Sequence, residues 1–414
     1  MNDHCHDEPL DRNSGHDSIG RREFLTLMIA ASLSTTSVFA QTPEDTRARF
    51  RKMSEEAERR GLAEPFKGIT TDGNIIEGLF PIKPTGVSTA SVRQAAEKFI
   101  ASLTTEQRGK VLFPIDDAEW RKWMNQHFYQ RQGVSFQEMT PSQREAAFGL
   151  MSESLSAKGM RLTRDIMRLN ETLAELTADH EFLGEWLYFI TIMGKPSATD
   201  PWGWQLDGHH AIINYFVLGD QVVMTPHFAG SEPVIANAGK YRGTAILQEE
   251  QTQGLKLIQA LSDGHRKKAI LDFSKTSNNN LTEAFKDNLA LDYTGIRASE
   301  LPDAHQQQIV ELADLYIGNM DDGHAKIKMD EVKRHLESTY FAWIGGTENA
   351  SVFYYRIHSP VVLIEFDHQR PANLRGTGAN QPTRQHIHTV VRTPNGNDYG
   401  KDLLREHYLK RHGR

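Results

Sequence analysis

The spacing of apolar residues changes near residue 185, and the change separates a helical part of the chain from a part rich in strands. Before this point, apolar side chains recur every three or four positions, as on one side of an amphipathic helix. Val92 and Phe99 belong to one such stripe, and Ile166 and Leu173 belong to another. The pattern predicts helices over 89–103, 141–157 and 162–177.

Beyond this point, short runs rich in aromatic and β-branched residues replace the helical spacing, which is typical of β-strands. Strands are predicted over 185–193, 203–218, 221–228, 339–344, 351–358, 360–368 and 384–393. Gly219 and Asp220 lie between two of these runs and predict a two-residue hairpin turn. Helical spacing returns over 247–262, 281–291, 304–319 and 325–338, and a last helix is predicted over about 399–411.

Helices therefore come first, and a helical insertion separates two groups of strands. This grouping predicts an α+β fold with a mainly antiparallel sheet, rather than alternating β-α-β units. The predicted strands carry apolar residues on both faces, so we expect both faces to be covered, at least one of them by helices. Residues 66–414 are expected to form a single domain, preceded by a charged helical arm over 41–65.

The N-terminus has the features of an export signal. Arg21 and Arg22 are followed by Glu-Phe-Leu, then by an apolar run from Leu27 to Val38 and by Ala40. The run is shorter than the roughly 20 residues that a membrane span needs, which favours a cleaved signal peptide. The paired arginines resemble the twin-arginine signal. We therefore expect the twin-arginine translocase as partner, cleavage after Ala40, and a periplasmic or secreted mature protein without stable membrane insertion.

Charge and cysteine content narrow the chemistry of the mature part. Residues 1–40 hold 3 basic and 6 acidic side chains of a chain with net charge −7, so the remainder has a net charge of −4. That balance disfavours nucleic acid as a partner. The single cysteine, Cys5, lies in the predicted signal. The mature chain therefore has no disulfide, no thiolate metal ligand and no cysteine nucleophile.

Histidines in the predicted strands are the strongest candidates for chemistry. His386 and His388 are two residues apart on a strand and therefore project from the same face. Two such imidazoles can hold a divalent Zn, Fe, Mn or Cu ion. His209, His210 or Glu365 would supply a further ligand, although His209 and His210 face opposite ways on a continuous strand. A metal-free polar network of buried histidines is the alternative.

A second hypothesis needs no metal. Asp207, Glu365 and Asp367 could supply an acid and a base, with burial raising the pKa of one of them. Trp202 and Trp204 could stack on sugar rings, or could simply pack in the core. The remaining substrate-binding candidates are Arg356, Arg392 and Asn395. The arginines either clamp an anionic substrate or pair with neighbouring carboxylates, and Asn395 lies in a predicted turn whose backbone amides could bind an anion.

Eleven motifs in order along the chain carry a resemblance to a known family. They are GITTDG (68–73), GLFPI (78–82), TGVST (85–89), DDAEWRKW (116–123), QREAAFGL (143–150), PWGWQLDGHH (201–210), YFVLGDQVVMTP (215–226), GSEP (230–233), YFAWIGG (340–346) and RIHSPVVLIEFDHQ (356–369), followed by QHIHTVVRTPNGNDYGKDLL (385–404). Together they resemble the domain-of-unknown-function family numbered 3500, from about residue 66 to the C-terminus. The resemblance implies one family unit rather than two modules, and it implies no established activity.

The sequence thus favours an exported metal-dependent enzyme, a hydrolase, lyase or oxidoreductase acting on a small organic or carbohydrate-like substrate. Its metal would act as Lewis acid or water activator. Two alternatives remain at this stage. The chain could be a non-catalytic periplasmic protein that binds a small molecule, or a metal-free hydrolase that uses its carboxylates.

Overall fold

A computed structural model describes residues 43–374 and 380–412, so the predicted signal peptide lies outside the described residues. The chain divides into two compact units, Met1–Thr46 and Arg47–Arg414, and the description that follows concerns the second. No helix in the described ranges is long and apolar enough to cross a membrane.

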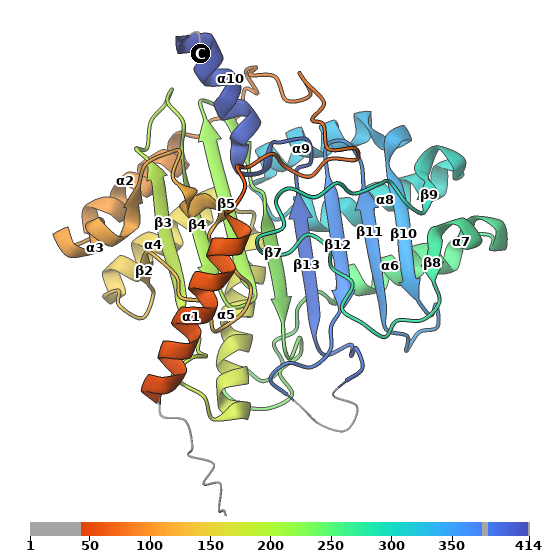
Figure 1. Cartoon of the computed structure of the whole chain (residues 1–414), viewed down its shortest axis with the longest axis horizontal. Helices are drawn as coiled ribbons and strands as arrows, with labels where there is room; N and C mark the ends of the chain where they lie inside the picture. Colours follow the sequence, from red (N-terminus) through yellow and green to blue (C-terminus); the bar gives the residue numbers. More distant parts are fainter. Residues whose placement is uncertain (1–42, 375–379, 413–414) are drawn as a thin grey trace, which may run out of the picture. The chain divides into compact units, whose positions relative to one another are not determined.

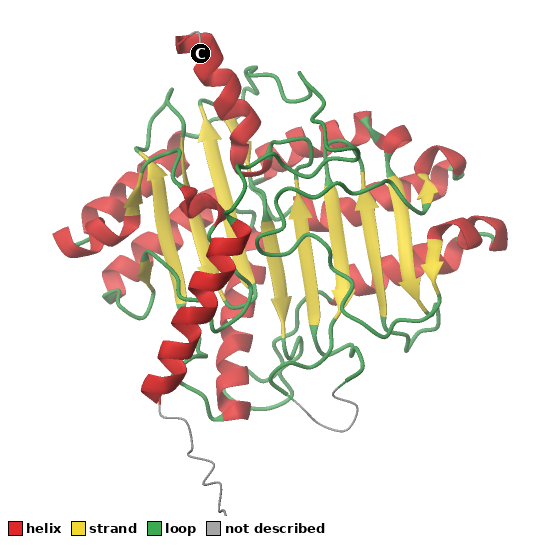
Figure 2. Cartoon of the chain, viewed as in Figure 1, coloured by secondary structure: helices red, strands yellow, loops and turns green. Residues whose placement is uncertain are grey.

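One large sheet organises this unit (Figures 1 and 2). Within the described residues its strands are β1 (Leu112–Phe113), β2 (Val134–Ser135), β3 (Tyr188–Gly194), β4 (Trp202–Gly208), β5 (Ala211–Leu218), β6 (Gln221–Val223), β7 (His227–Ser231), β8 (Ile270–Asp272), β9 (Ile296–Arg297), β10 (Tyr340–Gly345), β11 (Phe353–His358), β12 (Leu363–His368) and β13 (Ile387–Arg392). The order is β1-β3-β4-β5-β7-β13-β12-β11-β10-β8, with β2 beside β3, β6 beside β5 and β9 beside β10. All these pairs are antiparallel except β1 with β3 and β8 with β10. The predicted α+β class and mainly antiparallel sheet are confirmed.

The α-helices of the described residues are α1 (Pro43–Gly61), α2 (Ala90–Ser102), α3 (Thr105–Val111), α4 (Pro141–Ser154), α5 (Ala157–Thr177), α6 (Gln248–Ala260), α7 (Asp263–Ala269), α8 (Asp303–Ile317), α9 (Asp322–Arg334) and α10 (Lys401–His412). Local chemistry explains where several of them begin. At α4 the Thr140 hydroxyl accepts a hydrogen bond from the Gln143 amide, and the Gln143 side chain accepts one from the Thr140 amide.

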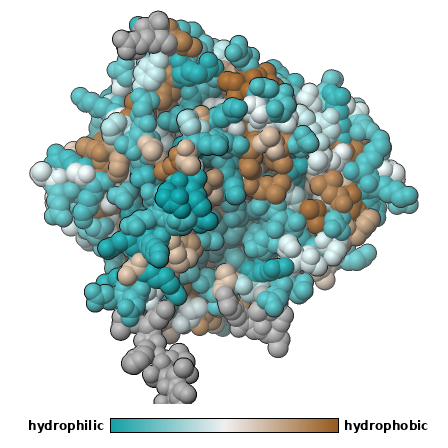
Figure 3. Space-filling view, viewed as in Figure 1, coloured by the Kyte–Doolittle hydropathy of each residue, from teal (hydrophilic) through white to brown (hydrophobic). Residues whose placement is uncertain are grey.

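The two faces of the sheet differ in what covers them. In Figure 1, α4, α5, α6 and α8 lie behind the sheet, whereas helix α1 and long irregular segments lie in front of it. The helix-covered face carries the main apolar core, which includes Leu206, Ile213 and Tyr355. Figure 3 shows the opposite side of the molecule as mostly hydrophilic, with apolar side chains visible between the irregular segments.

Strand pairing places His388, Glu365 and Asp367 on the face of the sheet that the irregular segments cross, which we call the loop-covered face. Residues directly opposite each other in an antiparallel pair share a face. His388 is paired with Asp367 on one side and with Gly230 on the other, and Glu365 is paired with Val390. All of these positions therefore face the irregular segments, as the two-residue periodicity of His386 and His388 predicts.

Three predicted elements differ from the structure. The strand predicted over 221–228 is two strands, β6 and β7, each of which pairs with β5. The strand predicted over 203–218 is two strands, β4 and β5, joined by a turn at His209 and His210. The helix predicted over 281–291 is irregular backbone. Here the amides of Leu281 and Thr282 donate to the Glu365 carboxylate, which fixes the start of this segment.

Candidate metal centre

Three histidines meet at one end of the loop-covered face. His388 lies in β13, His386 lies directly before it, and His210 lies in the β4–β5 turn. The Nε2 atoms of His386 and His388 are 3.0 Å apart, and those of His386 and His210 are 3.4 Å apart. Each of the three residues offers one ring nitrogen such that all lie within 4.8 Å of one another. All three side chains are buried.

The β4–β5 turn brings His210 into this group. Gly208 is paired with Ala211, so His209 and His210 are the two turn residues. His210 has a φ of 64°, in the left-handed region that side chains other than glycine rarely adopt. Its amide donates to the Asn125 carbonyl and its carbonyl accepts from the Gly230 amide. These bonds hold the strained backbone and point the ring at β13.

The Nδ1 atoms of His386 and His388 have partners that fix the positions of the ring protons. His386 Nδ1 lies 2.7 Å from the Arg370 carbonyl oxygen, which has no proton to give, so Nδ1 must donate. His388 Nδ1 lies 2.7 Å from Glu283 Oε1. Metal-bound histidines commonly donate their other N–H to a carbonyl or a carboxylate in this way. In the neutral rings, both Nε2 atoms then present lone pairs.

Electrostatics favour neutral rings at His386 and His210 beside an ionised Glu283. Burial first, then repulsion from His388, lowers the pKa of His386 well below its ordinary value. Burial and the neighbouring histidines lower the pKa of His210 in the same way. Desolvation raises the pKa of Glu283, but its electrostatic interaction and hydrogen bond with His388, with the bonds from Asn280 and Asn125, outweigh this and leave that pKa below its ordinary value. Neutral imidazole is the form that binds metal.

The distances between nitrogens fit a metal ion. Two lone pairs 3.0 Å apart repel each other unless a cation or a proton lies between them. With metal–nitrogen bonds of about 2.0–2.1 Å, tetrahedral ligands are separated by about 3.3–3.4 Å. The residues present therefore fit a three-histidine centre. A metal-free network would need an additional proton on one of the rings.

The side chain of His209 does not join the three-histidine group. Its Nδ1 lies 2.8 Å from Asn170 Oδ1, and its ring stacks on that of His210 with centroids 3.9 Å apart. It lines a cavity with His127 and Arg131, among other residues. The turn at residues 209 and 210 thus sends one histidine to the three-histidine group and the other to this cavity.

Glu365 and Asp367 contact the irregular segment over 276–283 rather than the three histidines. Glu365 accepts from the amides of Leu281 and Thr282 and from the Tyr354 hydroxyl. Asp367 accepts from the Asn279 amide and forms an ion pair with Lys275 at 2.9 Å. Both carboxylates hold in place the segment that carries Glu283.

Asp207 is also separate from the three-histidine group. It is 4% exposed and accepts a hydrogen bond from Arg131 Nε at 3.0 Å. Burial raises its pKa to about 6, against the charge of Arg131. Its second oxygen, Oδ2, has no hydrogen-bond partner within the described ranges. Asp207, Glu365 and Asp367 each have a basic side chain or backbone amides bound to them, and the structure does not group them as one acid–base pair.

The five substrate-binding candidates are buried among other side chains. Trp202 and Trp204 lie in the main core, where their indole N–H groups donate to the Ser197 carbonyl and to the Ser154 hydroxyl. Arg392 pairs with Asp287 and Asp398, both at 2.7 Å. Arg356 donates to the Thr294 hydroxyl and the Asp292 carbonyl. Asn395, with a φ of 59°, donates to the Pro360 carbonyl.

Glu283 is the functional candidate that the sequence did not reveal. It lies in a segment whose spacing predicts a helix, far along the chain from both β13 and the β4–β5 turn. Its side chain reaches His388 only because Glu365 and Asp367 bind the segment before it. No local pattern indicates this contact, since it depends on tertiary structure.

The comparisons with known proteins identify the family. The model of a family described as "Protein of unknown function (DUF3500)" matches residues 85–401, which is more than half of the chain. The chain belongs to the DUF3500 family. The resemblance seen in the sequence motifs is confirmed, with a matched range shorter at both ends. The range that DUF3500 covers includes the three histidines and Glu283. Comparisons with curated proteins and with solved structures found no match.

Proposed function

We propose that the chain is an exported metal-dependent enzyme that acts on a small organic or carbohydrate-like substrate. His210, His386 and His388 would hold one divalent transition metal. The observation that carries the proposal is the convergence of three buried Nε2 atoms, two of them on rings whose Nδ1 is bound to a carbonyl or a carboxylate. When bound, the metal would supply a Lewis acid that polarises water or substrate.

The donor set narrows the choice of metal. Three neutral imidazoles suit Zn, Cu or Fe, whereas Mn prefers carboxylate and water oxygens. Glu365, expected from sequence as a further ligand, is bound to backbone amides instead. Three protein ligands leave a fourth position for water or substrate, as in catalytic zinc sites. This supports a catalytic metal more than a fully enclosed structural one.

A cavity beside His209 supports a small substrate. Its walls include the aromatic rings of Phe128, Tyr129 and Phe189 and the guanidinium of Arg131. His209 separates this cavity from His210, whose ring it covers. Aromatic walls with a cation would suit a sugar ring or a small organic acid.

Metal content is the first test of the proposal. We expect about one transition metal per chain in protein purified after native export, and loss of that metal in His386→Ala and His388→Ala. His209→Gln is the matched control, because this residue lies in the same turn and bonds to Asn170 rather than to the group. Wild-type protein without stoichiometric metal, with unchanged stability in both alanine variants, would contradict the proposal.

Turnover distinguishes the proposed enzyme from the main alternative function, a non-catalytic periplasmic protein that binds a small molecule. The three histidines are only 3 to 6% exposed, and this restricts the access of a substrate to the metal. The low exposure therefore favours the non-catalytic alternative. We expect the metal-loaded protein to turn over at least one member of a panel of small esters, lactones and glycosides, and His388→Ala to abolish this. Saturable binding of panel members without turnover would favour the binding protein.

Export has its own test. We expect the periplasmic protein to begin at Gln41, and replacement of Arg21 and Arg22 by lysine to leave a precursor in the cytoplasm. N-terminal sequencing of both fractions measures this. Export that continues unchanged in the double-lysine variant would exclude the twin-arginine route and leave the metal proposal intact.

A further inference from the structure

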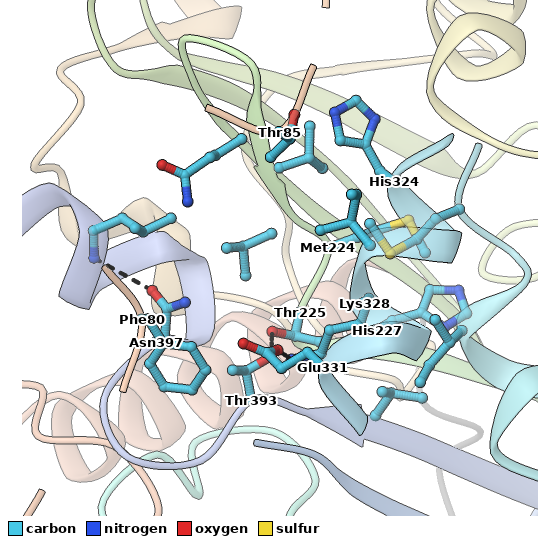
Figure 4. A pocket seen from close by; sticks show the side chains of 18 of the residues that line it. Phe80, Thr85, Met224, Thr225, His227, His324, Lys328, Glu331, Thr393 and Asn397 are labelled. Carbon is cyan, nitrogen blue, oxygen red and sulfur yellow. Dashed lines mark hydrogen bonds and ion pairs between the residues drawn. The ribbon is translucent and has the colours of Figure 1, made fainter. Parts of the chain in front are cut away.

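A second cavity lies on the other face of the sheet, away from the three histidines (Figure 4). His227, at the start of β7, lines it and is paired with Val391, which also lines it. Neither shares a face with His388, which is paired with Gly230. The cavity lies between β7, helices α8 and α9, and the segment around Phe80. It is therefore separate from the proposed metal centre.

The walls of this cavity are mainly apolar. They include Phe80, Val223, Met224, Ile317 and Met320, all of which are buried. Figure 4 shows Met224 around this cavity together with Thr225 and with Lys328 and Glu331 of α9. Thioether side chains adapt to ligands of different shapes. Such walls fit a ring or a short hydrocarbon body.

The interior contains polar groups whose hydrogen-bonding capacity is unused. His227 is 6% exposed, and neither of its ring nitrogens forms a hydrogen bond within the part of the chain that the structure describes. Burial lowers its pKa to about 4, so the ring is neutral at pH 7 with one donor and one acceptor. Asn397 accepts a hydrogen bond from the Leu403 amide, but its Nδ2 has no partner among the described residues. A buried polar group without a partner is costly, so such groups indicate a ligand or water.

Charge is concentrated nearer the surface. Lys328 pairs with Glu331 at 2.6 Å, and both line the cavity. Lys83 and Arg334 also line it, are exposed, and form no ion pair within the described ranges. Three cations therefore face one anion, and the imbalance favours a ligand with a negative group at the mouth.

We propose that this cavity binds a small amphipathic hydroxy acid, with its carboxylate at the mouth near Lys83 and Arg334 and its hydroxyl at the buried His227. A phenolic acid has this arrangement, since an aromatic ring separates the two polar ends. The apolar walls around Met224 would contact the ring. A simple fatty acid would leave His227 without a partner, and a neutral phenol would leave the cations uncompensated.

Calorimetric titration with 4-hydroxyphenylacetate tests this proposal directly. We expect saturable 1:1 binding. Phenylacetate, which lacks the hydroxyl, should bind about tenfold more weakly, because one hydrogen bond to a buried neutral group has roughly that effect. 4-Hydroxyphenylacetamide, which lacks the charge, should also bind more weakly. Absence of saturable binding by the phenolic acid would overturn the proposal, as would equal binding of all three compounds.

Variants locate the binding site. His227→Phe keeps a flat ring but removes both ring nitrogens, and should lower the affinity for 4-hydroxyphenylacetate about tenfold, with a much smaller effect on that for phenylacetate. Arg334→Gln should weaken both acids about 2- to 5-fold. Lys333→Gln is the matched control, because Lys333 is exposed on the same turn of α9 but does not line the cavity. Equal affinities in wild type and His227→Phe would overturn the assignment.

His227→Phe is also expected to fold, since the imidazole gives up no hydrogen bond within the described residues. Because the inference does not depend on the metal, we expect chelator-treated protein to bind the phenolic acid with unchanged affinity. Binding that requires metal would place the ligand at the three-histidine centre and overturn the second site.

Discussion

Glu283 contacts the ring of His388 on the side opposite the other two histidines, and this position defines its role. A carboxylate there fixes the proton on Nδ1 and makes Nε2 a stronger donor to a cation. Asn280 donates to the same oxygen at 3.0 Å, which fixes the direction of the carboxylate. Glu283 would therefore act through His388 rather than as a ligand.

Glu283→Gln tests this role at the scale of one residue. The amide keeps the shape of the side chain but removes its charge, so we expect metal affinity to fall about 10- to 100-fold without loss of fold. Competition with a chromophoric chelator measures the affinity. Glu249→Gln, on the exposed side of α6, serves as control. Equal affinities in Glu283→Gln and wild type would remove Glu283 from the site.

Glu119 gives a prediction for pH. It is 2% exposed, and burial raises its pKa to about 8, against the opposing charge of Lys122. Between pH 4.5, its ordinary pKa, and about 8, the folded state keeps a proton that the unfolded state has lost. The free energy of unfolding should therefore fall as pH rises through this window, by at most about 1.4 kcal/mol per pH unit.

Glu119→Gln should remove this contribution, so the variant should gain stability relative to wild type as the pH rises from 5 to 8. Chemical denaturation at several pH values measures the difference. Parallel pH profiles for the two proteins would show that Glu119 is ionised in the folded state.

At the scale of elements, the segment over 276–283 shows how irregular backbone can be fixed without secondary structure. Two carboxylates from β12, Glu365 and Asp367, accept hydrogen bonds from its amides. The bonds connect this segment to the central part of the sheet. Residues that sequence reasoning assigned to catalysis thus position the segment that carries Glu283.

Glu365→Ala should release this segment. The amides of Leu281 and Thr282 lose their acceptor, so we expect faster hydrogen exchange at both, and weaker metal binding although Glu365 touches none of the three histidines. Tyr354→Phe removes a single donor to Glu365 and should have a smaller effect in the same direction. Unchanged exchange at residues 281 and 282 would exclude this coupling.

The sequence predicted contacts that depend on local periodicity and missed those that depend on tertiary structure. His386 and His388 share a face because side chains alternate along any strand. The choice between His209 and His210 depended on a turn, and its signal in the sequence is the Asp207-Gly208 pair directly before it. Gly208 precedes the turn, but apolar residues on both sides favoured one continuous strand. Because of the turn, each residue of β5 lies on the face opposite to the one that a continuous strand would give it. Leu206, for example, shares a face with Ile213.

At the scale of the whole molecule, the three histidines connect the two groups of strands. His210 belongs to the group formed before the helical insertion, and His386 and His388 belong to the group after it. β7 lies between β5 and β13 and pairs with both. A metal at this point would cross-link the two halves of the sheet.

Chelation should therefore lower global stability. A ligand that binds only the folded state stabilises it by about 2.7 kcal/mol when its free concentration is 100 times its dissociation constant. We expect EDTA to lower the thermal midpoint of wild type and to leave that of His388→Ala unchanged. An identical shift in both proteins would indicate that the chelator acts elsewhere.

The order of the ligands along the chain has a consequence for biosynthesis. His210 leaves the ribosome long before His386 and His388, so a nascent chain that has exposed the first imidazole still lacks the other two. High affinity would arise only after β13 has been inserted beside β7. Loading would then be a late, post-translational event, and the compartment in which folding is completed would determine which metal the protein acquires.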